Sequence, residues 1–441
     1  MFLALYYLQN LKEGGTEPMI DLNIPYLNDE QKSLAMLMKD FCEREVDLKA
    51  LNEIADQKIP PNATSADLRA RMPWDLISKA HDAGLRQIAA PTEFGGGGYE
   101  EDHLAQGVMA EMAGYMGGQF GRLMTIAWKQ MSAFAYAPKD VAKEVLDDFM
   151  NDRKTMMGAS ITEPNSGSDM LMPYDEPGVS GQYFAHLEGD DWVLNGDKMF
   201  CTAGGVSNYL TVMVRTEPKG PITKSVTQFI IDTRKPGWSI ARVNDMMGNE
   251  LVSNVQMHFE NYRLPDKYRV SPVNGAFEVM KSRLAGKSLH MFAVLGWAER
   301  AWEDMKEYSI ARIQGGKPII RHNNIGTLVA ETDCLLRLAR LQLYHDAWEW
   351  HNLGQGQMRD VLGWYYINWF LKKVLMRIIE AGLEIYGGMA PQKELTFEHW
   401  ARVHLSIMHG GSTGLLSLVK AANIIGKTGP SSTSADTLYE T

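Results

Sequence analysis

Apolar residues recur at helical spacing through the first third of the chain. Leu34, Leu37 and Phe41 lie three or four residues apart, and the run that begins at Trp74 continues with Ile77 in the same way. Residues at this spacing share one face of an α-helix, so the pattern predicts helices that each bury one side. Four consecutive glycines at 95–98 interrupt it. We expect an N-terminal α-helical domain over residues 28–153.

The pattern changes near Met156 to short runs that are rich in β-branched and aromatic residues, which are typical of strands. Segments 192–196 and 198–202 predict two strands joined by an Asn-Gly turn, because Asn-Gly favours the tight turn of a β-hairpin. Further strands are predicted over 209–215, 228–232 and 255–259. We therefore expect a central β-domain over residues 154–270, folded as a small barrel or sandwich.

Helical spacing returns after Pro272. Long helices are predicted over about 277–314, 322–353 and 358–386, followed by a last helix over about 413–425. The third of these is apolar on most sides, which indicates burial within a bundle or at a contact between subunits. The C-terminal bundle would span residues 271–425. The order helical, β, helical predicts an α+β fold, and the sequence has no internal repeat.

The two ends of the chain differ from these three domains. Residues 1–8 are apolar, but no basic residue precedes them, and residues 11–18 hold no small-residue cleavage pattern. We expect residues 1–27 to form an N-terminal extension rather than a secretory signal. Residues 426–441 are polar and rich in Gly, Ser and Thr, and they are predicted to form a loose tail.

Composition restricts the function further. The chain has 441 residues, of which 45% are hydrophobic and 22% are charged, so it can bury a large core. With 44 basic and 54 acidic residues the formal charge is −10, which argues against nonspecific binding to nucleic acid or to anionic membranes. No apolar run approaches the roughly 20 residues that a membrane span needs.

The residue types that bind metals are widely spaced. Cys42, Cys201 and Cys334 lie far apart and form no Cys-x-x-Cys pair. We therefore expect neither a disulfide framework nor a cysteine-based zinc site, and we expect a reducing, cytoplasmic location. His345 and His351 are six residues apart, which places them about 240° apart around a helix and opposes joint metal binding. No metal site is expected.

The segment 156–169 (MMGASITEPNSGSD) is the first candidate for chemistry. Its first half is small and strand-like, and its second half is a turn with many hydroxyl and N–H donors. Such a loop can lie along a cofactor or a phosphate, and an ordinary surface turn would have the same composition. The chain has no P-loop, His-Glu-x-x-His, Gly-x-Ser-x-Gly or strand-linked Gly-x-Gly-x-x-Gly motif.

Together with three further segments, this loop resembles the acyl-CoA dehydrogenase superfamily of FAD-dependent flavoenzymes. The other segments are 195–205 (NGDKMFCTAGG), 312–319 (RIQGGKPI) and 384–389 (EIYGGM), and they follow in the order of the family. The resemblance covers residues 28–425. It implies an N-terminal helical domain, a central β-domain and a C-terminal four-helix bundle, with FAD held between the β-domain and the bundle.

The resemblance also implies roles for individual residues. The flavin ring would meet Ile161 and Thr162 on the first loop, and Phe200 and Thr202 on the second segment. Phe200 stands where the family often has Trp. Hydroxyl and N–H groups near the ring can stabilise the charge of a reduced flavin. Ser168 would border the acyl-CoA channel.

A second set of residues would contact the dinucleotide. Arg312 would reach the FAD pyrophosphate of a neighbouring subunit, and Gly387 and Gly388 would let the backbone approach the dinucleotide closely. Three positions depart from the family pattern, since Gly315 stands where the family has Phe, and Asn323 and Glu384 each stand where it has Gln. A carboxylate at Glu384 would disfavour a pyrophosphate unless it points away or is paired.

The glutamate that serves the family as a base is missing. A typical acyl-CoA dehydrogenase removes the α-proton of its substrate with a glutamate while a hydride passes from the β-carbon to flavin N5. In segment 407–415 (IMHGGSTGL), His409 occupies the glutamate position. A second subgroup carries the base on the first long helix of the bundle, where this chain has Gly286 beside Lys287. Lys287 is either a solvated helix residue or one that favours an anionic acyl group or a CoA phosphate.

Two interpretations of His409 follow. As a base, which imidazole suits near neutral pH, it predicts an FAD-dependent oxidoreductase that desaturates an acyl-CoA thioester at the α,β position. That enzyme would pass electrons to an electron-transfer flavoprotein and form a homodimer or homotetramer. As a polar wall residue, His409 predicts a non-dehydrogenating flavoenzyme, such as an eliminase, a desulfinase or a nitroalkane-oxidase-like enzyme. It also fits a catalytically silent FAD-binding subunit of a hetero-oligomer.

Overall fold

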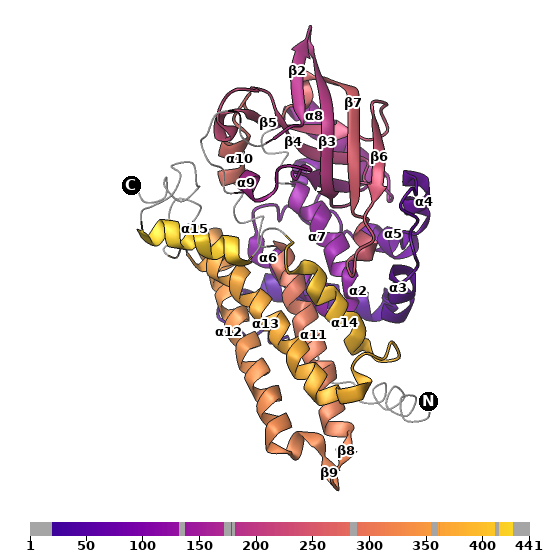
Figure 1. The fold of residues 1–441 in the computed structure, drawn as a ribbon, viewed down its shortest axis with the longest axis vertical. Helices are drawn as coiled ribbons and strands as arrows, with labels where there is room; N and C mark the ends of the chain where they lie inside the picture. Colours follow the sequence, from indigo (N-terminus) through magenta and orange to yellow (C-terminus); the bar gives the residue numbers. More distant parts are fainter. Residues whose placement is uncertain are drawn as a thin grey trace.

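The computed structural model describes residues 20–131, 137–171, 178, 181–282, 289–353, 360, 362–410 and 414–426. Figure 1 shows a β-sheet at one end of the molecule, a bundle of long helices at the other, and the N-terminal helices beside and between them. The predicted α+β class, with helical parts on both sides of a central β-domain in sequence, is confirmed. Within the described residues, no helix is long and apolar enough to cross a membrane.

The N-terminal part is helical, as predicted. Its α-helices are α2 (Asp29–Glu45), α3 (Leu48–Ala55), α4 (Ser65–Ala70), α5 (Trp74–Asp82), α6 (His103–Gly117), α7 (Gln119–Met131) and α8 (Lys139–Asn151). Helix α2 starts with a capping box in which Asn28 and Gln31 bond each other's backbone N–H groups. The predicted interruption lies at the short 3₁₀ helix Thr92–Phe94, which Gly95 ends with a left-handed φ of 84°.

The middle of the chain forms a seven-stranded sheet. Its strands are β1 (Met157–Ser160), β2 (Phe184–Glu188), β3 (Asp191–Cys201), β4 (Tyr209–Arg215), β5 (Val226–Asp232), β6 (Trp238–Val243) and β7 (Val255–Pro265). The order across the sheet is β1-β4-β2-β3-β7-β6, and β5 pairs with β4. The predicted strands 209–215, 228–232 and 255–259 lie within β4, β5 and β7.

The predicted Asn-Gly turn is wrong. Asn195 and Gly196 lie inside the continuous strand β3, where the pairing with β7 shifts register between Leu194 and Gly196. Gly196 has a φ of 128°, and a Cβ there would come within 3.0 Å of the backbone of Gln182 and Tyr183. The dipeptide therefore forms a β-bulge, because strands on both sides of β3 hold it extended and leave no room for a chain reversal.

The C-terminal part is again helical. It contains α10 (Ala276–Ser282), α11 (Leu289–Ala311), α12 (Asn323–Leu353), α13 (Gly363–Tyr386), α14 (Thr396–Ile407) and α15 (Gly414–Gly426). A small hairpin of β8 (Ile313–Gln314) and β9 (Lys317–Pro318) joins α11 to α12. The predicted long helices correspond to α11, α12, α13 and α15, whereas α14 was not predicted.

Helices α6 and α11 pack backbone to backbone and join the N-terminal part to the bundle. A Cβ at Gly296 would lie 2.1 Å from the carbonyl oxygen of Glu111, and one at Gly114 would lie 2.2 Å from that of Ala293. Such an approach is open only to glycine. Helix α7 follows α6 after a sharp turn and packs on β1, so it bridges the bundle and the sheet (Figure 1).

Candidate functional site

The ends of β1 and β3 meet at one edge of the sheet. Ala159 pairs with Thr202 across an antiparallel bridge, and the Met199 N–H donates to the Thr162 carbonyl at 2.8 Å. These contacts bring together two pairs of residues from distant parts of the sequence. We call the four residues the ring face: Ile161, Thr162, Phe200 and Thr202. The structure therefore assembles the set that the sequence assigned to the flavin ring.

Phe200 is the most exposed member of the ring face. Its side chain is 53% exposed, and its backbone has a φ of 51°, in the left-handed region that non-glycine residues rarely adopt. Ile161, Thr162 and Thr202 are each partly exposed beside it. An aromatic ring held at the surface by a strained backbone points to a ligand that covers it, because the free energy gained by burying the ring would offset part of the strain energy.

A buried ion pair lies directly under the ring face. The Lys198 ammonium donates to the Ile161 carbonyl at 3.0 Å and to the Glu163 carboxylate at 2.8 Å. The second Glu163 oxygen accepts the backbone N–H groups of Gln182 and Tyr183. Burial lowers the pKa of Lys198, and the negative charge of Glu163 opposes that shift. The pair fixes the loop after β1 to β3 and to the start of β2.

Sequence reasoning missed this pair, although both residues lie in the quoted motifs. The available signal was Lys198 itself, a lysine inside a strand-like segment, whose ammonium must find a partner wherever the strand is buried on both faces. The partner could not be read from the sequence, because Glu163 lies in a different motif.

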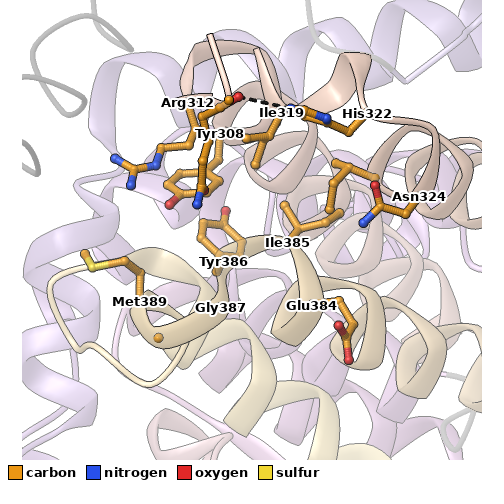
Figure 2. Close-up of a pocket in the computed structure, with 14 residues that line it drawn as sticks. Tyr308, Arg312, Ile319, His322, Asn324, Glu384, Ile385, Tyr386, Gly387 and Met389 are labelled. Atoms are coloured by element: carbon orange, nitrogen blue, oxygen red, sulfur yellow. Dashed lines mark hydrogen bonds between the residues drawn. The ribbon is translucent and has the colours of Figure 1, made fainter. Parts of the chain in front are cut away.

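A cavity of about 670 Å³ lies at the far end of the bundle, beside the β8–β9 hairpin. Arg312, at the end of α11, faces it together with Gly387 and Gly388, which follow α13. Figure 2 shows Arg312 and Gly387 beside the rings of Tyr308 and Tyr386, whose centroids are 4.4 Å apart and whose planes are tilted by 34°. We call this site the bundle cavity.

The bundle cavity is suited to an anion. No carboxylate of the described chain pairs with the Arg312 guanidinium, and Figure 2 shows the Glu384 carboxylate directed away from it. Gly387 has a φ of 54°, and a Cβ at Gly387 or Gly388 would meet no atom within 4 Å. These glycines are therefore not required for packing, and they leave backbone open to a ligand. Asn323 is the exposed first residue of α12, whereas its neighbour Asn324 lines the cavity.

The ring face and the bundle cavity lie in different parts of the molecule. Residues of the β8–β9 hairpin line the cavity, and Figure 1 shows this hairpin at the bottom of the bundle. Strands β1 and β3 belong to the sheet, which lies at the top. One chain therefore does not bring the two sets of residues around a single ligand.

His409 lies in the turn that follows α14, where its side chain is exposed. The next residue, Gly410, accepts a hydrogen bond from the buried Lys372 ammonium at 3.3 Å, and burial lowers the pKa of Lys372 to about 8. Ser168 is the exposed first residue of the short helix α9 (Ser168–Leu171).

Three further expectations concern residues that the structure does not describe. Gly286 and Lys287 lie outside the described residues. The same holds for most of the N-terminal extension and almost all of the C-terminal tail. Among the described residues, no group of three His, Cys, Asp or Glu side chains could hold a metal ion.

Comparisons with known proteins agree on one family. Its three domain models match consecutively: the acyl-CoA dehydrogenase N-terminal domain over residues 43–149, the middle domain over 158–262 and the C-terminal domain over 274–422. A 3-(aryl)acrylate reductase of Clostridium sporogenes is 26% identical over 388 residues, which cover 87% of this chain and 98% of that relative.

Solved structures show the same fold. Butyryl-CoA dehydrogenase of Megasphaera elsdenii superposes with a TM-score of 0.76 at 20% identity, over 90% of this chain and 98% of that one. The FAD complex of PigA superposes with a TM-score of 0.78 at 18% identity, over 91% and 98% of the two chains. The chain therefore belongs to the acyl-CoA dehydrogenase family of flavoprotein oxidoreductases.

Proposed function

We propose that this chain binds FAD and desaturates an acyl-CoA thioester between its α and β carbons. The observation that carries the proposal is the ring face: an exposed aromatic side chain and two threonines, which meet at the ends of two strands above a buried ion pair. The family to which the chain belongs supports the reaction class. Bound FAD would supply the two-electron acceptor that the desaturation requires.

The described residues would hold FAD through two separate sets of contacts. Phe200, Thr162 and Thr202 would hold the ring, and Arg312 with the Gly387–Gly388 backbone would hold a pyrophosphate. Since the ring face and the bundle cavity lie in different parts of one chain, we propose that each cofactor is shared by two chains. A homodimer or a homotetramer would provide this arrangement. We further propose an electron-transfer flavoprotein as the acceptor of the electrons.

We propose that His409 takes the α-proton of the substrate. Its exposed position leaves the imidazole accessible to a ligand, and the turn that carries it is fixed through the contact of Gly410 with Lys372. A positioned general base contributes about 10²–10⁴-fold to rate. Ser168 would line the entry of the acyl-CoA.

The experiment that tests the function is anaerobic reduction of the purified protein with acyl-CoA esters of different chain lengths. The protein should be yellow, release FAD on acid precipitation, and bleach with a substrate. His409→Ala should keep its FAD and slow bleaching by about 10²–10⁴-fold, whereas His186→Ala, at an exposed position on β2, should bleach like the parent.

Two results would redirect the proposal. If His409→Ala bleaches as fast as the parent, the base lies elsewhere and His409 is only a wall residue. If the yellow protein binds acyl-CoA esters but none of them bleaches it, the silent-subunit interpretation replaces the dehydrogenase.

A further inference from the structure

The loop of residues 244–254 joins β6 to β7 and contains a short 3₁₀ helix, Glu250–Val252. We call it the β6–β7 loop. On either side of the 3₁₀ helix, Asn249 and Ser253 have φ angles of 61° and 45°, in the left-handed region that non-glycine residues rarely adopt. Such strain persists only where the surrounding structure holds the backbone, and it is frequent at functional sites. The contacts of this loop therefore matter.

The β6–β7 loop is bonded to the strand end that carries the ring face. The Ala203 N–H donates to the Val252 carbonyl at 2.8 Å, and Ala203 directly follows Thr202 of the ring face. Val255, the first residue after the loop, pairs with Cys201 at the end of β3. The position of the loop is therefore tied to the position of the ring face.

The same loop is bonded to helix α14. The Asn249 side chain donates to the Ser406 hydroxyl at 2.8 Å, and one turn earlier the Arg402 guanidinium donates to the Glu250 carboxylate at 3.0 Å. A Cβ at Gly248 would lie 2.7 Å from the carbonyl oxygen of Arg402, so the loop backbone rests directly against the helix backbone. A shift of the loop would therefore move α14.

Helix α14 leads into the turn that carries His409, three residues after Ser406. In the proposed reaction, the base and the flavin ring act on neighbouring carbons, so their separation must be fixed. The ring face belongs to the sheet, whereas His409 belongs to the bundle. Bonds such as that from Trp400 to Asp304 on α11 fix α14 within the bundle, but they do not fix it to the sheet. A misplacement of about 1 Å can cost about 10²-fold in rate.

We propose that the β6–β7 loop sets the separation between His409 and the flavin ring, with Asn249 as the positioning residue nearest to the base. This inference rests on the proposed function. Asn249 acts through Ser406 and α14 rather than on the substrate, and the Glu250 contact holds the loop on the same helix. One side of the loop follows the ring face and the other side follows the base.

The first test is the rate of flavin reduction, measured anaerobically by stopped flow with the acyl-CoA ester that bleaches the parent. Asn249→Gly removes the bond to Ser406 and keeps a residue suited to the left-handed φ. Reduction at saturating substrate should slow by about 10-fold, while the dissociation constant of the ester stays within about twofold. Asn261→Gly is the matched control, because Asn261 has a φ of 52° at an exposed position of β7, and this variant should react like the parent.

A double-variant cycle separates positioning from a purely structural role. If Asn249 acts through the base, Asn249→Gly should slow the parent but should not slow His409→Ala further, because that variant has no base to misplace. A role in general stability would slow both proteins by the same factor.

The second test is hydrogen–deuterium exchange, which needs no turnover. Loss of the Asn249 bond should speed exchange of the backbone amides of 404–410 by about 2- to 10-fold, the usual effect of one hydrogen bond. Gly248→Ala should do the same, because its methyl group would push the loop away from α14. It is also the second variant if Asn249→Gly folds poorly. Asn261→Gly should leave this segment unchanged.

The outcomes separate this inference from the proposed function. If His409→Ala slows bleaching but Asn249→Gly does not, or if Asn249→Gly slows both backgrounds equally, the inference is overturned while the desaturation stands. If His409→Ala bleaches as fast as the parent, the base assignment and the inference fall together. If no ester bleaches the yellow protein, the desaturation is refuted, and faster exchange in Asn249→Gly retains the loop as the element that holds the His409 turn.

Discussion

Replacement of Lys198 by Met tests whether the ion pair under the ring face holds that face in place. Lys198 is 0% exposed and Glu163 is 3% exposed, so neither charge has access to solvent. Met fills similar space but leaves the buried Glu163 carboxylate without its hydrogen-bonded ammonium, and it also leaves the Ile161 carbonyl without its donor.

The expected loss follows from this burial. Removing one partner of a buried ion pair costs about 3–5 kcal/mol, because the remaining charge keeps its desolvation penalty. Unfolding of a chain of 441 residues as one unit has an entropy of roughly 0.9 kcal/mol/K, so the midpoint of thermal unfolding should fall by about 3–6 °C. If the β-domain unfolds separately, the fall is larger because the unfolding entropy is smaller.

Thermal unfolding should be followed by circular dichroism together with the fraction of FAD retained at each temperature. Glu163→Gln with Lys198→Met should recover at least about half of the loss, because the double variant removes both charges and keeps one acceptor for the backbone amides of β2. Lys219→Met, at an exposed position of the same domain, is the control and should change the midpoint by less than about 1 °C.

A result for Lys198→Met that matches the Lys219→Met control would refute this reasoning. It would mean that water or another residue compensates the Glu163 charge. Absence of any recovery in the double variant would show that the loss comes from the Ile161 carbonyl left without its donor rather than from the unpaired Glu163 charge.

The remaining predictions concern the bundle cavity and the buried histidines. Arg312→Ala should weaken FAD binding by about 10-fold or more, the loss of a charged hydrogen bond, whereas Arg321→Ala, on the same connection but outside the cavity, should retain the cofactor in a dialysis assay. A Cβ at Gly388 would meet no atom within 4 Å, so Gly388→Ala should keep the unfolding midpoint of the parent while its affinity for FAD falls. An affinity for FAD equal to that of the parent would refute a contact between this backbone and the cofactor. Burial lowers the pKa of three histidines below the ordinary value of about 6.5, to about 4 for His103 and His399 and about 3 for His404. Their neutral forms stabilise the fold above about pH 6.5, and the contribution of each to the free energy of unfolding should fall by about 2 kcal/mol by pH 5. Urea unfolding at a series of pH values measures this fall, and His404→Leu should make it smaller.

The long helices show what the local sequence could predict. Helix α12 has a sustained helical pattern, and its predicted start lies within one residue of the observed Asn323. Helix α14 was missed because Leu395 provides no side-chain cap and because the segment combines aromatic and β-branched residues with two histidines, which favour helix only weakly. Burial against neighbouring helices compensates for this low propensity.

The sequence by itself determined the order of the three parts, the family to which the chain is similar and the position of a histidine where a glutamate is usual. These features depend on residue spacing and on motif identity, which are written along the chain. Only the tertiary structure decided that Asn195 and Gly196 form a bulge and that Lys198 pairs with Glu163. Each of these depends on which distant segments approach a residue and on how far they exclude water from it, and neither can be read from neighbours in sequence.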